Sequence, residues 1–71
     1  MNYFVVMIDY RDGREAVVDP EMTRRTVVSR IASGEFTDIA FIHHIVMGEL
    51  PQDVTDEMMD EAQAIALQAA E

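Results

Sequence analysis

The chain of 71 residues has no cysteine and no lysine, and it contains only three glycines and two prolines. Without cysteine, neither a disulfide nor a thiolate metal site can support so small a fold. Three glycines are too few for a glycine-rich phosphate-binding loop. We therefore expect a fold that depends on its apolar core, and we expect no cofactor.

Positive charge is missing from most of the chain. All five basic residues are arginines within the first 30 positions, whereas residues 31–71 hold nine of the 14 acidic residues and give the chain its net charge of −9. Direct binding of a nucleic-acid backbone requires clustered positive charge, so we do not expect it. The acidic residues either keep a small apolar protein soluble or meet a basic protein partner.

Long hydrophobic runs are also absent. The apolar run at residues 3–8 is too short to span a membrane or to act as a signal peptide, and Asp9 closes it. We expect a cytoplasmic protein with one domain over residues 1–71 and no membrane partner. Because 49% of the residues are apolar and a core of this size is marginal, self-association into a homodimer is an alternative way to bury them.

The strongest strand pattern lies at residues 36–47, where apolar residues fall on both alternating faces, as is typical of a central strand. Residues 2–10 form a second strand with two apolar faces. Asp12-Gly13 then predicts a tight hairpin to a strand at residues 14–18, with Tyr10 opposite Glu15 and Ile8 opposite Val17. Residues 47–52 form a loop that Leu50 could anchor to the protein body.

Two helices are expected. Asp19-Pro20 predicts a helix over residues 20–33, which Gly34 ends. Thr55 is the favoured N-cap of the second helix, with Asp53 as a competing cap, and Val54 and Met59 have the spacing of a hydrophobic staple. The apolar stripes are Val27, Val28, Ile31 and Ala32 in the first helix, and Met58, Met59, Ala62, Ile65, Ala66 and Ala69 in the second.

The expected fold class is therefore α+β. The element order is β-β-α-β-α, and the simplest architecture has two layers, with both helices packed on one face of a three-stranded sheet.

His43 and His44 are weak candidates for a metal site. Neighbours in a strand point to opposite faces, so the two imidazoles cannot bind one ion together without a bulge. A metal site usually needs three or four suitable ligands. We expect one histidine to pack under a helix and the other to be exposed, and we expect no metal.

Catalytic patterns are missing. Ser29, Ser33 and Thr37 have no sequence relation to His43 or His44 that would make a nucleophile–base pair. No carboxyl group has an apolar setting that would raise its pKa for acid–base chemistry. We expect no catalytic residues and no enzymatic activity.

The acidic series in the second half of the chain is the first candidate partner-binding surface. A row of carboxylates on a rigid helix resembles phosphates in charge and could occupy the basic surface of a protein that handles nucleic acid. The alternative is a solvated helix face. The series consists of Glu49, Asp53, Asp56, Glu57, Asp60 and Glu61.

The arginines Arg24, Arg25 and Arg30 form the second candidate surface, because arginine is enriched at interface hot spots. The alternative is that they pair with Glu21 or with acidic residues of the second helix. In size, acidity and lack of catalytic signatures the chain resembles small phage or mobile-element inhibitors, such as anti-CRISPR proteins, and some antitoxins. This resemblance involves no specific residues. It implies an inhibitor or regulator, and the residues do not name the partner.

Overall fold

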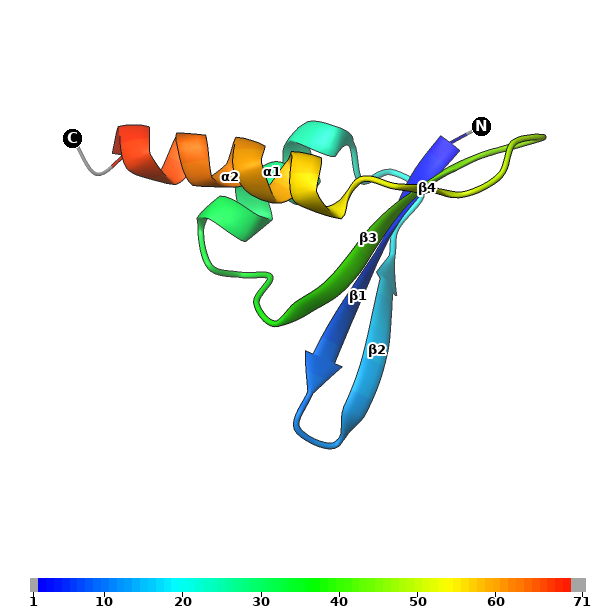
Figure 1. Cartoon of the computed structure of the whole chain (residues 1–71), viewed down its shortest axis with the longest axis horizontal. Helices are drawn as coiled ribbons and strands as arrows, with labels where there is room; N and C mark the ends of the chain where they lie inside the picture. The colour runs from blue at the N-terminus through cyan, green and yellow to red at the C-terminus, as the bar shows by residue number, and fades with distance from the viewer. Residues whose placement is uncertain (1, 70–71) are drawn as a thin grey trace.

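The computed structural model describes residues 2–69 as an α+β fold with a four-stranded sheet and two helices (Figure 1). Both helices lie at one end of the molecule, and the hairpin of the first two strands projects away from them. The elements in chain order are β1 (Asn2–Tyr10), β2 (Gly13–Val18), α1 (Arg24–Ala32), β3 (Ile39–Val46), β4 (Gln52–Asp53) and α2 (Thr55–Ala69).

The sheet has the strand order β2-β1-β3-β4, and all neighbouring strands are antiparallel. The predicted three-stranded sheet is therefore wrong by one short strand, and the observed element order is β-β-α-β-β-α. The central strand is β1, which pairs along most of its length with both β2 and β3. In contrast, β3 pairs with β4 only at His43 and His44.

The β1–β2 hairpin exists as predicted, but its register differs. Tyr10 lies opposite Gly13, and Ile8 lies opposite Glu15. The turn residues are thus Arg11 and Asp12, while Gly13 adopts a φ of 140°, a backbone conformation that favours glycine. The shift equals two residues, so it leaves every side chain of β2 on the expected face of the sheet.

The core lies between the helices and one face of the sheet. In β1 only the alternate residues Phe4, Val6 and Ile8 are buried. Because Val6 pairs with Ile42, the buried Ile42 shares their face. The helices and loops supply the remaining buried side chains, which are Met22, Val27, Val28, Phe36, Val54, Met58 and Ala62. Both helices therefore cover the same face, as predicted.

Helix α1 begins at Arg24 and not at Pro20. Asp19 instead forms a turn, in which the backbone N–H groups of Glu21 and Met22 donate to its side-chain and backbone oxygens. This turn leads Met22 into the core before the helix starts, and Thr23 becomes the N-cap by accepting from the backbone N–H of Thr26.

The end of α1 agrees with the sequence. Gly34 follows the helix with a φ of 84° and donates its backbone N–H to the carbonyl of Ile31.

Strand β3 is shorter than the predicted strand at residues 36–47. Phe36 is buried, but its backbone N–H donates to the carbonyl of Arg30 and not to a neighbouring strand. Asp38 has a φ of 55°, which lies outside the extended region, so the strand begins only at Ile39. The side chain of Phe36 thus closes the core under α1, while its backbone belongs to the loop.

The beginning of α2 is joined to β3. Thr55 accepts a hydrogen bond from the backbone N–H of Ile42 at 2.8 Å, and Val54 donates its own N–H to the Ile42 carbonyl. The hydroxyl of Thr55 is thus committed to the sheet, and Asp53 accepts from the backbone N–H of Thr55. The predicted Thr55 cap is wrong, because Thr55 is itself the first residue of α2; Asp53, the competing candidate, accepts the N–H of that first residue.

Two further expectations near α2 are wrong. The staple partner of Val54 was expected to be Met59, but Met58 is the methionine that is fully buried, and Met59 is 40% exposed. Leu50 does not anchor its loop, since it is 86% exposed.

Over residues 2–69, no helix combines the length and the apolar character needed to cross a bilayer.

The first prediction concerns the joint between α2 and β3. Thr55→Val leaves the Ile42 N–H without its acceptor, and we expect the free energy of unfolding to fall by about 1–2 kcal/mol. Thr55→Ser keeps the hydroxyl and should retain most of the stability. Urea unfolding of both variants measures this, and equal losses would contradict the role of the hydroxyl.

The second prediction uses the adjacent methionines of α2. Met58→Ala removes a fully buried side chain and should cost about 2–5 kcal/mol in unfolding free energy. Met59→Ala changes a side chain at the rim of the helix layer and should cost less than about 1 kcal/mol. Thermal unfolding of the two variants distinguishes these outcomes, and a larger loss for Met59→Ala would be evidence against the packing of α2.

Candidate protein-binding surfaces

The predicted acidic residues do not form one uniform surface. Glu49 lies in the exposed loop between β3 and β4, and Asp53 lies in β4. The remaining four acids belong to the first turns of α2, where all are exposed. The structure assigns different contacts to them.

Arg24 of α1 bridges two acids of α2. Its guanidinium lies 3.0 Å from a carboxylate oxygen of Glu57 and 2.9 Å from one of Glu61. The hydrogen bond with Glu61 is the main cause of a raised pKa for Arg24, and Glu57 acts in the same direction. These two carboxylates therefore contribute to the helix–helix contact and are partly neutralised.

Asp56 and Asp60 differ from this pair. They are one helical turn apart on α2, and both are exposed. In the part of the chain that the structure describes, neither side chain makes an ion pair or a hydrogen bond. The acidic series is thus divided into a paired side next to α1 and an unpaired side, Asp56 and Asp60, which we call the outer acidic side.

Asp53 has a structural role. It accepts hydrogen bonds from the side-chain hydroxyl and the backbone N–H of Thr55. These bonds, with the hydroxyl as the larger effect, hold the pKa of Asp53 below its ordinary value of 3.8. Nearby His43 lowers this pKa further through its charge. Asp53 therefore holds Thr55, the first residue of α2, whatever else it contacts.

The three arginines of the second candidate surface are not equivalent. Arg24 forms ion pairs with Glu57 and Glu61 of α2, as described above. Arg30 lies 3.4 Å from Glu35 and 5.7 Å above the centre of the Phe36 ring, where it helps to hold the loop after α1. Arg25 is exposed, and within residues 2–69 it has no ion-pair partner. The expected pairing with acids of the second helix thus holds for Arg24 only.

The histidines lie on opposite faces of the sheet, as expected from their neighbouring positions in a strand. His44 stacks on Phe4 with ring centres 4.5 Å apart, at the covered face. His43 contacts Phe41 at 4.2 Å, on the face that no helix covers. Among the described residues, no cluster of three or more histidine or acidic side chains could hold a metal ion.

One surface was missed by the sequence reasoning: the face of the sheet opposite the helices. Tyr3, Val5 and Met7 of β1 alternate with the buried residues and are partly exposed. Their cross-strand neighbours continue this surface, which we call the open sheet face and which also includes Ala16, Val18, Phe41, His43 and Ile45. The signal was present, because both faces of β1 are apolar, but it was interpreted as burial on both sides.

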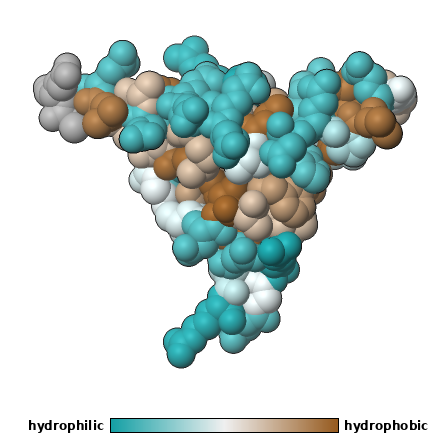
Figure 2. Space-filling model, viewed as in Figure 1, coloured by the Kyte–Doolittle hydropathy of each residue, from teal (hydrophilic) through white to brown (hydrophobic). Residues whose placement is uncertain are grey.

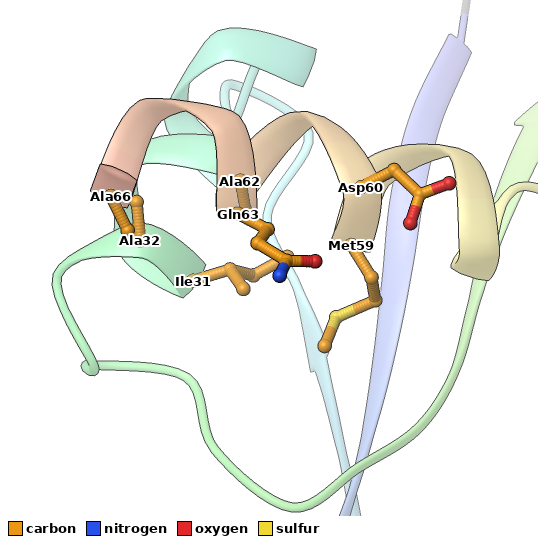
Figure 3. Close-up of a pocket in the computed structure, with 7 residues that line it drawn as sticks. All are labelled: Ile31, Ala32, Met59, Asp60, Ala62, Gln63 and Ala66. Atoms are coloured by element: carbon orange, nitrogen blue, oxygen red, sulfur yellow. The ribbon is translucent and has the colours of Figure 1, made fainter. Parts of the chain in front are cut away.

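Apolar side chains also lie at the two ends of the long axis of the molecule, one near the end of α2 and one at the loop before β4 (Figure 2). One group is Ile65 and Leu67 near the end of α2, and the other is Met47 and Leu50 in the loop before β4; all four are exposed. A shallow hollow of about 290 Å³ lies between the end of α1 and α2 (Figure 3). Its lining is small and apolar apart from Asp60 and Gln63, with no converging group that could perform chemistry.

The third prediction follows from the lowered pKa of Asp53. A depressed carboxyl pKa stabilises the fold above the ordinary value of 3.8, and this contribution is lost as the pH falls through the lower pKa of the folded state. Asp53→Ala should therefore lower the melting temperature at pH 7, and the difference from the unchanged protein should shrink below pH 3.8. A difference that persists unchanged at the lowest pH would contradict the charged cap.

Comparison with protein-family models, with curated proteins and with solved structures gave no match to this chain. The functional argument therefore depends on the geometry and charge of its own residues.

Proposed function

We propose that this chain is a small non-enzymatic interaction protein that presents the outer acidic side of α2 to a basic surface of a larger protein. The observation that carries the proposal is that Asp56 and Asp60 are exposed and unpaired among residues 2–69, although Arg24 lies close enough to bind two other acids of the same helix. The basic partner is a protein that handles nucleic acid, and the effect on it is inhibition or regulation.

The charge distribution supports this proposal. Residues 31–71 contain no lysine or arginine, and Arg24, the arginine that contacts α2, is paired with Glu57 and Glu61. No described basic side chain competes for the outer acidic side. A fixed negative surface of this kind accelerates association with a positive surface and makes the association sensitive to salt.

The rigidity of α2 also supports it. The helix is joined to β3 through Thr55, held at that first residue by Asp53 and linked to α1 through Arg24. Asp56 and Asp60 are about 6 Å apart along the helix axis, since each residue advances the helix by about 1.5 Å. Their positions are thus set before a partner arrives, which lowers the entropic cost of binding. Glu49, in the neighbouring loop, adds a third exposed acid.

The partner is identified by purifying the tagged chain from its host after nuclease treatment, at low and at high salt. We expect a basic protein that is retained at low salt and lost at high salt. A partner that resists high salt would contradict a mainly electrostatic contact.

The fourth prediction tests the surface itself. Asp56→Lys with Asp60→Lys should weaken binding of that partner at least tenfold and leave Glu57 and Glu61 to hold Arg24. Asp12→Lys with Glu15→Lys is the matched control, because it makes the same change in net charge on the exposed β1–β2 hairpin, away from α2. Isothermal titration at physiological salt measures both. Equal losses of affinity would show that only net charge matters, and no loss in either variant would overturn the proposal.

A further inference from the structure

We infer that the open sheet face is the interface of a symmetric homodimer, in which the sheets of two copies pack face to face. This inference goes beyond the proposed function, because it concerns the side of the sheet opposite α2. It follows from the shape, the charge and the extent of that face.

The open sheet face is continuous and almost entirely apolar. Val5, at its centre, has Val18 of β2 on one side and His43 of β3 on the other. The next residue of β1 on this face is Met7, which has Ala16 of β2 on one side and Phe41 of β3 on the other. Both helices cover the other face, and the side chains of Val5, Met7 and Phe41 remain partly exposed. The largest apolar patch of a monomeric protein is often functional, which makes this face a candidate interaction site.

The charge on this face suits a second copy. Two of its charged residues, Asp9 and Arg14, pair with each other at its end. His43 lies opposite Asp53 across β3 and β4, and Asp53 is held by Thr55. A copy with a net charge of −9 would be repelled by most surfaces of its partner but not by this one.

The layered fold also separates the acidic helices in such a dimer. Packed sheets are about 10 Å apart, and each helix layer adds about 10 Å on the outside. The two α2 helices would therefore lie on the order of 30 Å apart, several times the Debye length of about 8 Å in physiological salt. Self-association through this face leaves the outer acidic side of each copy accessible.

The side chains on the two flanks of β1 are complementary in size. The flank on β2 carries the smaller Ala16 and Val18, and the flank on β3 carries the larger Phe41 and Ile45. A two-fold axis parallel to β1 and between the sheets places β1 over its copy and β2 over β3 of the copy. Small side chains then face large ones in both halves, as an isologous interface requires.

The extent of the face sets the expected strength. A strand of nine residues is about 30 Å long, and three strands are about 14 Å wide including their spacing. The footprint is thus about 400 Å² on each copy, or about 800 Å² in total, which is below the roughly 1,200 Å² of stable specific interfaces and in the range of weak, transient ones. We expect a reversible dimer with a dissociation constant in the micromolar range, so that mass depends on protein concentration.

The test is sedimentation of the full chain from about 5 to about 500 µM, a range that brackets a micromolar dissociation constant. The expected mass rises from 8.0 kDa to twice that value. Val18→Glu, on the open sheet face but 49% exposed and so compatible with folding, should weaken dimerisation at least tenfold. Leu50→Glu is the control, because it places the same charge at an apolar side chain outside the face. A monomer over the whole range, or equal weakening by both variants, would overturn the inference.

Cross-linking gives a second measurement that does not depend on adding charge. Because the chain has no cysteine, Val5→Cys introduces a single thiol on β1, close to the same residue of the copy. A short bis-maleimide should link Val5→Cys into a dimer and leave Leu50→Cys largely monomeric, and the opposite result would overturn the arrangement. Asp56→Lys with Asp60→Lys should still dimerise, so failure of the dimer and failure of the acidic surface can be told apart.

Discussion

Both helices pack on one face of the sheet, and this arrangement determines most of the molecule. All buried residues of β1 lie on the side that meets Val27, Val28 and Met58, and their neighbours in sequence face the other way. Within the described residues 2–69, no further helix covers the second face. The apolar residues on the second face therefore remain at the surface, and the proposed dimer is a way to remove them from water.

The same layering distributes the charge. Arg24 links α1 to α2 by forming ion pairs with Glu57 and Glu61. The two helices therefore meet through these ion pairs at their outer edge and through apolar side chains below them. An exposed pair of this kind adds little stability, but it decides which carboxylates remain unpaired. The outer acidic side of α2 and the open sheet face thus occupy opposite sides of the protein. One surface is charged and the other nearly neutral, which suits them to different partners.

Local sequence patterns predicted the secondary structure well where a residue had only one possible structural role. The alternating apolar residues of β1, the stop at Gly34 and the opposite orientations of His43 and His44 were all predicted from the sequence and are present in the structure. The predictions failed where a residue had two possible partners. Asp19 could cap a helix or form a turn, and it forms the turn, which accompanies the burial of Met22. Thr55 could cap α2 or bond to β3, and its hydroxyl accepts from the backbone N–H of Ile42 in β3.

The candidate site shows the same division. The sequence by itself determined the charge imbalance, the absence of cysteine and the apolar content, because these depend on composition and not on folding. It also determined that the histidines could not share a metal within one regular strand, since the strand repeat separates them. Only the tertiary structure decided which acids Arg24 would bind and which face of β1 the helices would cover. Those outcomes depend on contacts between residues more than 30 positions apart, which no local pattern encodes.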